Sequence, residues 1–465
     1  MTAPATSLRD RPMRPAVPSS AIPEPRCTPT TITGWGLYPS VTGYQLESEN
    51  LEQITQNAVL SRGLGRSYGD SSLPSGNRPV AASPLADRLL AFDAATGIVR
   101  AEAGCPLWRI NRIFLPRGWF TPVTPGTHYV TLGGMVAADV HGKSHHRDGC
   151  FGEHVTRLKM RVADGRILEC SDAQEPELFR ATLGGMGLTG HVLEVEFRLQ
   201  SIPSPWIWQE SEQTPNFERT LAALQEAKSW PFTVCWADFL LRGPGAGRGV
   251  VMKGRWAQPG EAPAQAPRFR RAAELPILLP NWFLQLWMPA LFWRLNYWKH
   301  GARMRSGIVH PETFFYPLDI VRHWNRLYGR RGFTQYQCVL PVADGFARHQ
   351  RFLGLLQQHR APVFLCVIKD CGAEGKGMIS FPKPGISYAL DMPINSTTQS
   401  LVDTLNEFVI AEKGRVYLAK DAFTRAEHFQ AMDPRLESWT RVRRLWDPEG
   451  RLRSAQSVRV LGDRP

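Results

Sequence analysis

Arg62-Gly-Leu-Gly-Arg-Ser-Tyr-Gly-Asp70 contains three glycines and two arginines within nine residues. A bound diphosphate needs several backbone N–H groups that converge on it, and glycine allows that approach because it lacks a Cβ atom and tolerates positive φ. The spacing matches neither the G-x-G-x-x-G loop of nicotinamide-dinucleotide enzymes nor the G-x-x-x-x-G-K-[ST] loop of nucleoside triphosphatases. This stretch therefore indicates a phosphate-binding loop of a third kind.

Two more glycine-rich segments follow, at residues 124–143 and 183–190. Taken alone, a loop of this type is more often an ordinary turn. Here three such loops occur in one region, and two of them lie beside arginine, histidine or lysine. Their combination favours one binding site that all three loops build together.

The surrounding chain alternates polar and apolar residues over short runs, which is typical of half-buried strands. Helix-like segments lie between these runs, so we expect an α+β fold whose loops carry the ligand chemistry. The expected strands are residues 98–103, 157–162, 191–197, 334–340, 362–368 and 386–391, and the expected helices are residues 107–114, 349–359 and 400–412.

The bulk composition restricts the possible partners. A chain of 465 residues predicts two or three domains, and a Pro/Ser break at residues 201–205 suits a boundary. The formal net charge of +13 favours phosphate-bearing ligands, an anionic membrane surface or nucleic acid. We expect no nucleic acid, because the sequence has no recognition-helix, zinc-finger or RNA-binding motif. The eight cysteines are scattered without a C-x-x-C pair, which predicts neither a zinc site nor a disulfide framework.

The N-terminal residues 1–32 are rich in Pro, Ser, Thr and Ala and lack the continuous apolar segment of a secretory signal. We expect them to form a disordered leader. No run approaches the roughly 20 apolar residues of a membrane span. The sequence therefore predicts a cytoplasmic protein.

The glycine loops also carry a family resemblance. Residues 62–70 resemble the first pyrophosphate loop of the vanillyl-alcohol-oxidase (PCMH-type) family of FAD-linked oxidases, and residues 125–146 resemble its second flavin loop. Motifs similar to one branch of that family, the polyprenyl-phosphoryl-ribose oxidases, occur in the same order between Gly34 and Leu461. They are Phe315-Tyr-Pro-Leu-Asp319, Gln335-Tyr-Gln337, Ser380-Phe-Pro-Lys-Pro-Gly385, Tyr417-Leu-Ala-Lys-Asp421 and Val442-Arg-Arg444.

This resemblance implies an FAD-dependent oxidoreductase that acts on a CH–OH group. The branch oxidises the 2′-hydroxyl of a polyprenyl-phosphate-linked ribose to the 2-keto sugar, the first half of epimerisation to an arabinose donor, and a partner keto-reductase completes it. Two alternatives stay open: a soluble aldonolactone or alditol oxidase of the same fold, and a flavin-binding module without activity.

The resemblance also implies a two-domain architecture. Residues 33–202 and 412–465 would form the FAD-binding domain. Residues 203–411 would form an inserted substrate-binding domain built on an antiparallel sheet.

The cofactor implied by the resemblance is FAD. Many sugar oxidases of the family attach FAD covalently through a histidine in the first loop. Arg66 stands at that position and its guanidinium cannot form that bond, so we expect non-covalent FAD. The residues expected to bind it are Arg62, Gly63, Leu64, Gly65, Arg66, Ser67, Tyr68, Gly69, Asp70, Pro125, Gly126, Thr127, Gly133, Gly134, Ala138, His141, Gly142, His145, Gly187, Val192 and Tyr417.

Oxidation of an alcohol needs a hydride acceptor and a base for the hydroxyl proton. The resemblance places Lys420 at the active site, where burial would lower its pKa enough for it to accept or relay a proton. It places His141 beside the flavin and Tyr68 between flavin and substrate. The histidines that follow His141 would suit a metal on a helix, but Gly142 and the loop context argue against one, and we expect no metal.

For the sugar phosphate, the resemblance assigns amide groups to hydroxyls and lysines to the phosphodiester. Ser387 stands where the branch has asparagine, which puts the detail of sugar recognition in doubt. Ala389 stands where it has a cysteine beside the flavin, so thiol-directed inhibition should fail. The residues expected to bind substrate are Lys143, Trp236, Tyr316, Gln335, Gln337, Lys369 and Ser387.

Residues 275–298 form the most hydrophobic segment of the chain, and Pro276, Pro280 and Pro289 prevent a straight spanning helix. Between residues 253 and 305 there are nine basic and two acidic residues. Tryptophan and leucine beside basic residues suit peripheral contact with the inner membrane. A buried core segment has the same composition, so both interpretations stay open.

Overall fold

The computed structural model describes residues 26–269, 271–283, 288–300, 305–342 and 345–464. The expected leader lies outside these residues as far as position 25. Its last part differs from the expectation, because Arg26–Thr33 forms strand β1 and pairs antiparallel with β2 (Ser40–Glu47). Threonines favour extended backbone, and Ile32 in this strand is buried against neighbouring apolar residues.

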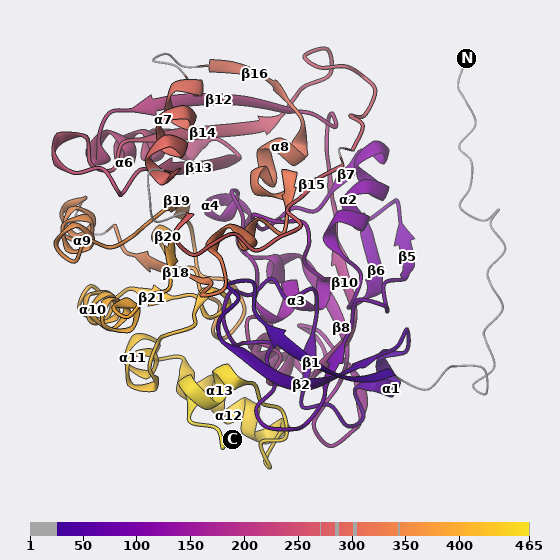
Figure 1. Ribbon diagram of the computed structural model, residues 1–465. Helices are drawn as coiled ribbons and strands as arrows, with labels where there is room; N and C mark the ends of the chain where they lie inside the picture. The colour runs from indigo at the N-terminus through magenta and orange to yellow at the C-terminus, as the bar shows by residue number, and fades with distance from the viewer. Residues whose placement is uncertain (1–25, 270, 284–287, 301–304, 343–344, 465) are drawn as a thin grey trace, which may run out of the picture.

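Two sheets are built from the first part of the chain (Figure 1). One has the order β1-β2-β4-β3, with parallel pairing of β4 to both β2 and β3. The other is antiparallel, with the order β5-β6-β10-β8-β9, and β7 and β11 form a separate ribbon. Their bounds are β3 Leu60–Arg62, β4 Val80–Ala82, β5 Leu89–Asp93, β6 Ile98–Glu102, β7 Trp119–Phe120, β8 Val155–Arg161, β9 Ile167–Cys170, β10 His191–Arg198 and β11 Gln200–Ser201.

The largest sheet has eight strands, all antiparallel, in the order β16-β12-β14-β13-β19-β20-β18-β21. Its central strands β18 and β20 are buried on both faces, although they carry the polar residues Gln335, Gln337 and Asp391. The last strand in this order comes from beyond residue 411, so the C-terminal segment is joined to the sheet. The bounds are β12 Ile207–Thr214, β13 Phe232–Ala237, β14 Gly249–Trp256, β16 Arg305–Val309, β18 Phe333–Leu340, β19 Leu365–Cys371, β20 Gly385–Pro393 and β21 Arg415–Val416. The domain boundaries implied by the resemblance stay a prediction.

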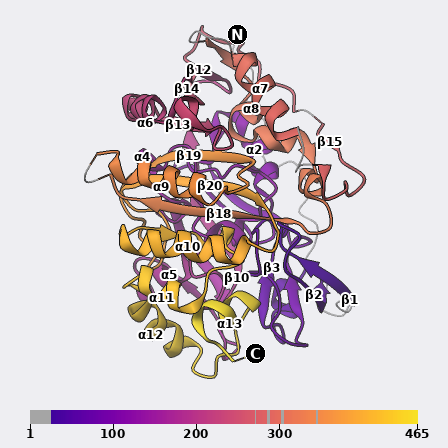
Figure 2. The ribbon, with the colours of Figure 1, turned by 60° about the vertical axis from the view of Figure 1, so that its left-hand side comes forward.

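Helices cover the sheets with their apolar faces. Leu107, Ile110 and Phe114 are buried at helical spacing in α2 (Leu107–Phe114), the helix expected at these residues. Figure 2 shows α10 (Thr398–Ala411) lying across the sheet beside β18. The other α-helices are α1 Leu51–Ile54, α3 Leu132–Ala137, α4 His145–Asp148, α5 Pro176–Thr182, α6 Phe217–Glu226, α7 Met288–His300, α8 Pro311–Phe315, α9 Ala347–Gln358, α11 Ala426–Met432, α12 Leu436–Trp446 and α13 Ala455–Leu461.

The described parts of the apolar segment, residues 275–283 and 288–298, divide between core and surface, and residues 284–287 lie outside the described part of the chain. Phe283 and Met288 pack against a buried aromatic cluster, and Trp293 is buried with its indole N–H donating to a backbone carbonyl at 2.8 Å. Ile277 and Trp282 are exposed. In the described part of the chain no helix has both the length and the apolar character to cross a membrane.

Candidate functional site

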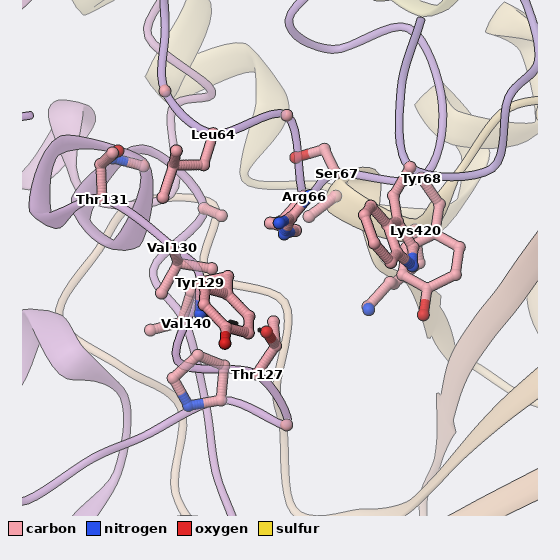
Figure 3. Close-up of a pocket in the computed structure, with 18 of the residues that line it drawn as sticks. Leu64, Arg66, Ser67, Tyr68, Thr127, Tyr129, Val130, Thr131, Val140 and Lys420 are labelled. Carbon is pink, nitrogen blue, oxygen red and sulfur yellow. Dashed lines mark hydrogen bonds between the residues drawn. The ribbon is translucent and has the colours of Figure 1, made fainter. Parts of the chain in front are cut away.

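A cavity of about 470 Å³ lies where the glycine loops, the eight-stranded sheet and the C-terminal segment meet. Small-molecule sites span roughly 300–1,000 Å³. Figure 3 shows the first loop, with Leu64 to Tyr68, facing the second loop, with Thr127 to Thr131, across this cavity. The third glycine loop contributes Gly187 and Gly190 to the same wall. The expectation that the three loops share one site therefore agrees with the geometry.

The first loop is shaped for close approach by a ligand. Gly65 has a φ of +63°, a conformation that glycine adopts without strain. A Cβ on Gly63 would stand 2.3 Å from the Thr131 hydroxyl oxygen of the second loop. Within the described chain, none of the N–H groups of residues 63–67 donates to a backbone carbonyl. These donors are therefore left to a molecule in the cavity.

Three residues predicted to bind FAD in this loop instead fix its position behind the cavity. The Arg62 guanidinium donates to a serine hydroxyl and to a backbone carbonyl, each at 2.7 Å. Gly69 lies so close to Asp421 that a Cβ would stand 1.9 Å from its carbonyl oxygen. Asp70 is buried and accepts two hydrogen bonds from Arg459, at 2.6 and 2.9 Å.

Arg66 faces the cavity between aromatic rings. Its guanidinium carbon lies 4.1 Å from the centroid of Trp35 and 5.6 Å from that of Tyr129. Burial lowers the pKa of Arg66 to about 10, while the nearby carboxylate of Asp319 acts in the opposite direction. Among the described residues the guanidinium has these stacking partners but no hydrogen-bond acceptor, so it suits an anionic ligand.

The second and third loops bring the remaining FAD-binding candidates to the cavity wall. A Cβ on Gly126 would meet nothing within 4 Å, so this backbone borders open space. His145 lies apart from the wall, because its ring nitrogen accepts a hydrogen bond from the Gly372 N–H at 3.1 Å. The candidates that line the cavity from these loops and the C-terminal segment are Pro125, Gly126, Thr127, Gly133, Gly134, Ala138, His141, Gly142, Gly187, Val192 and Tyr417.

Lys420 and Tyr68 lie side by side at one end of the cavity (Figure 3). The Lys420 ammonium nitrogen is 3.9 Å from the centre of the Tyr68 ring. Burial lowers the pKa of Lys420 and raises the pKa of Asp391, which stands behind it and counteracts the shift. The Gln335 amide donates to the Asp391 carboxylate at 2.5 Å. This buried group can therefore exchange a proton near neutral pH.

Two further lysines face the same cavity. Burial lowers the pKa of Lys143 to about 7 and also lowers the pKa of Lys369. The charged neighbour that acts on the pKa of Lys143 is Lys369, which is itself a cation. The Lys143 ammonium group donates to the backbone carbonyl of Phe314 and lies 4.6 Å from the centre of its ring. An anionic ligand would relieve the unfavourable burial of these charges.

His141 is held as a neutral imidazole. Burial, followed by the charge of Lys369, lowers its pKa well below the ordinary value. The Gln337 amide donates to the Nε2 atom of His141 and to the Ser387 hydroxyl, both at 2.9 Å. This bonding leaves the proton on Nδ1, which is buried and has no partner among the described residues.

Five of the predicted substrate residues line the cavity and two support it. Ser387 stands behind Gln337, and Tyr316 is buried with its hydroxyl bonded to Thr124 and to the Asn111 amide, the latter at 2.8 Å. The five that line the cavity are Lys143, Trp236, Gln335, Gln337 and Lys369.

Several residues of this site were not predicted from the sequence. Asp319 ends the quoted motif at residues 315–319 and Asp391 ends the expected strand at residues 386–391, and these positions were the available signal. The stacked aromatic residues come from distant parts of the chain and had no local signal. The missed residues that line the cavity include Trp35, Trp108, Tyr129, Asp319, Arg322 and Trp324.

Metal ligation has no support in the described residues, which contain no group of three or more His, Cys, Asp or Glu side chains arranged for an ion. The rings of His141 and His145 are 6.2 Å apart, and His146 bonds to the Trp230 carbonyl at 2.8 Å.

Comparison with known proteins agrees with these features. A family model described as an FAD binding domain matches residues 53–171. The chain is 31% identical over 454 residues to decaprenylphosphoryl-β-D-ribose oxidase of Mycolicibacterium smegmatis, which covers 93% of this chain and 98% of that protein. It is 32% identical over 366 residues to an uncharacterized protein of Streptomyces coelicolor, covering 74% of this chain and 96% of that protein. It is 24% identical over 225 residues to D-arabinono-1,4-lactone oxidase of Yarrowia lipolytica, covering 47% of this chain and 37% of that protein.

Proposed function

The chain belongs to the family of FAD-linked oxidases that includes decaprenylphosphoryl-β-D-ribose oxidase, and from this we propose that it oxidises the 2′-hydroxyl of a polyprenyl-phosphoryl-ribose to the 2-keto sugar. Membership confirms the predicted family, the cofactor FAD and the class of FAD-dependent oxidoreductase, together with the PCMH-type FAD-binding fold. The proposal adds the substrate, the division into residues 33–202 with 412–465 and 203–411, and the roles of individual residues.

The residues present in the cavity fit FAD. The free N–H groups of residues 63–67 and the unpaired guanidinium of Arg66 would hold the pyrophosphate, and the open space beside Gly126 gives it room. Arg66 offers charge and hydrogen bonds but no site for a covalent link. We therefore propose that FAD is bound non-covalently.

Lys420 is the proposed base. Bound FAD supplies the acceptor for the hydride from the carbon that carries the hydroxyl group. The hydroxyl proton requires a separate acceptor, and burial favours the neutral amine of Lys420 that can take it. Asp391 would balance the charge that Lys420 gains, and Tyr68 restricts where the ammonium group can lie.

The cationic and amide groups support a phosphorylated sugar as substrate. Lys143 and Lys369 would meet the phosphodiester, because both line the cavity and neither forms an ion pair with a carboxylate of the described residues. The side-chain amides of Gln335 and Gln337, which line the cavity, would bind sugar hydroxyls. The convergence of these lysines with Lys420 in one cavity is the observation that carries the proposal.

The proposed product indicates a partner enzyme, and the proposed substrate indicates a cellular location. A 2-keto sugar must be reduced at the same carbon to complete an epimerisation, so we propose a keto-reductase as the partner enzyme. A lipid-linked substrate would place the enzyme at the cytoplasmic face of the inner membrane as a peripheral protein.

Reduction of the bound flavin tests this function. The purified protein should be yellow and should release its FAD on acid precipitation, which also tests the non-covalent link. Anaerobic mixing with a polyprenyl-phosphoryl-ribose should bleach the flavin absorbance. Bleaching by free alditols or aldonolactones alone would instead support the alternative, an oxidase of soluble sugars. The partial similarity to a lactone oxidase favours that alternative.

A further inference from the structure

We call the two paired segments at residues 271–283 and 320–331, the second of which lines the cavity, the rim. Its two segments are paired through β15 (Ala273–Glu274) and β17 (Val321–Arg322), which run parallel. The pairing continues beyond these strands, with the Leu279 N–H donating to the Arg326 carbonyl at 3.0 Å. Residues 321–324 of the rim also line the cavity. The rim is therefore continuous with the site, and β15 lies at the outer edge of the molecule (Figure 2).

The outer face of the rim exposes large apolar side chains. Ile277, Leu278, Trp282 and Ile320 are exposed by 62%, 45%, 58% and 57%. Scattered exposed apolar residues are ordinary, but a group of this size beside a cavity mouth indicates a binding surface. A tryptophan among aliphatic side chains suits the interface between water and lipid.

The rim is also strongly basic. It contains five arginines and one acidic residue, Glu274. Arg271, Arg330 and Arg331 are exposed, and Arg322 is exposed at the mouth itself. Cationic side chains around exposed apolar ones complement an anionic bilayer, to which each contributes electrostatic attraction.

The inner face of the rim is fixed over the reactive end of the cavity. Phe283, Trp324 and Leu327 pack against the buried cluster that contains Tyr68 and Phe333. The rim is thus packed on the cluster that contains Tyr68, the residue whose ring lies beside the Lys420 ammonium group. A surface that docks on the rim would present its lipids directly at the mouth.

We propose that the rim docks on an anionic lipid bilayer, from which the lipid-linked substrate enters the cavity. The inference rests on the proposed function, because it names where the polyprenyl-phosphate substrate comes from. It differs from membrane contact through the whole of residues 275–298, since Phe283, Met288 and Trp293 pack into the protein. It adds the second segment, residues 320–331, which the apolar composition did not mark.

Co-sedimentation of the FAD-loaded protein with vesicles tests the proposal. The protein should sediment with phosphatidylcholine vesicles that contain phosphatidylglycerol, and much less with phosphatidylcholine alone. The triple variant Arg271→Glu/Arg330→Glu/Arg331→Glu should weaken binding to anionic vesicles about a hundredfold or more. The variant Ile277→Ser/Leu278→Ser/Trp282→Ser should also reduce binding, because it removes the apolar contact.

A matched control lies on α12, far from the rim in Figure 1, where Arg441, Arg444 and Leu445 are exposed. The variant Arg441→Glu/Arg444→Glu/Leu445→Ser should bind vesicles as the parent does. FAD content and Tm are measured for each variant, and both should be unchanged because every substituted side chain is exposed. The proposal is overturned if the parent ignores anionic vesicles, if the rim variants bind as well as the parent, or if the control loses as much binding.

A second measurement separates this proposal from the proposed function. A short-chain, water-soluble polyprenyl-phosphoryl-ribose should bleach the flavin equally in the parent and in the rim variants. Bleaching without vesicle binding overturns the membrane surface and leaves the function standing. Vesicle binding with no bleaching by any polyprenyl-phosphoryl-ribose overturns the function, and the docking surface then lacks the substrate on which its role depends.

Discussion

Lys420 combines two properties that usually oppose each other. Its side chain is a basic amine, and it lies in a buried position. Its pKa is lowered by burial, and the charge of Asp391 acts in the opposite direction. A neutral amine is therefore available near neutral pH, which an exposed lysine does not provide.

Replacing this amine should separate cofactor binding from chemistry. Lys420→Met and Lys420→Arg should both retain FAD, and both should lower the rate of flavin reduction about a hundredfold or more, the usual contribution of a general base. The arginine variant keeps the positive charge but cannot give up its proton. Anaerobic stopped-flow absorbance measures the rate, and full activity of Lys420→Arg would exclude proton acceptance by residue 420.

The pH profile of that rate should report on Asp391. The rate should rise with pH as the Lys420 ammonium group loses its proton, and level off above the lowered pKa. The Asp391 carboxylate raises the pKa of Lys420, so Asp391→Asn should move the midpoint of the profile to lower pH. A midpoint unchanged by Asp391→Asn, with FAD still bound, would contradict the coupling of the two groups.

Lys143 should lower the stability of the substrate-free folded protein and strengthen the binding of a phosphorylated substrate. Its pKa is lowered from 10.5 to about 7, so between these values the unfolded chain binds more protons and stability rises with pH. Below about pH 7 the penalty is complete, on the order of several kcal/mol. Without substrate, Lys143→Met should therefore raise Tm more at pH 6 than at pH 9, while weakening the binding of a phosphorylated substrate. Thermal unfolding at the two pH values measures the first effect, and an equal shift at both would contradict it.

At the scale of the elements, the loops need glycine for two different reasons, the fold at one position and the ligand at another. Gly69 is needed by the fold, because a Cβ would stand 1.9 Å from the Asp421 carbonyl oxygen. A Cβ on Gly126 would meet no protein atom within 4 Å, yet Gly126 borders the cavity that the cofactor would fill. The close contact at Gly69 therefore matters for folding, whereas the open space at Gly126 matters for the ligand.

Two alanine variants should show this difference. Gly69→Ala should lower the Tm of the apoprotein, since backbone atoms must move to admit the methyl group. Gly126→Ala should leave that Tm unchanged and reduce FAD content or affinity. Tm by circular dichroism and FAD by absorbance after desalting give the two readouts, and FAD retained in full by Gly126→Ala would place the cofactor away from this loop.

Secondary structure was predictable where one signal dominated. The helix at residues 107–114 is amphipathic, and the strands around residues 334–340 and 386–391 alternate polar with apolar or aromatic residues over much of their length. The segment at residues 275–298 could not be assigned from composition, because core residues such as Trp293 and surface residues such as Trp282 are equally apolar. Only the tertiary packing separates them.

The site was predictable as a family pattern and much less so as geometry. The glycine loops and Lys420 carry motifs, and they do face one cavity. Asp70 and Tyr316 carry motifs too, but their side chains are used to join elements, through Arg459 and Asn111. Sequence similarity marks both uses alike, whereas burial and hydrogen bonding distinguish them.

At the scale of the whole molecule, the cavity is shared by parts of the chain that are distant in sequence. Its wall contains tryptophans from the first loops and from the eight-stranded sheet region, together with the segment at residues 417–420. The hydrophobic core likewise runs without interruption from the first sheets to the C-terminal helices. This arrangement ties the stability of each part to occupancy of the site.

FAD should therefore stabilise the molecule as one unit. A ligand present at about 100 times its Kd adds about 2.7 kcal/mol, which in a chain of this size corresponds to a Tm increase of a few degrees. Far-UV circular dichroism follows all the sheets, and the fluorescence of the 15 tryptophans includes that of Trp35, Trp108, Trp236 and Trp324 in the cavity wall. Titration of the apoprotein with FAD should move both transitions together by the same amount. Two transitions of which FAD moves only one would mean that a single part of the chain binds the cofactor, against the shared wall that the structure describes.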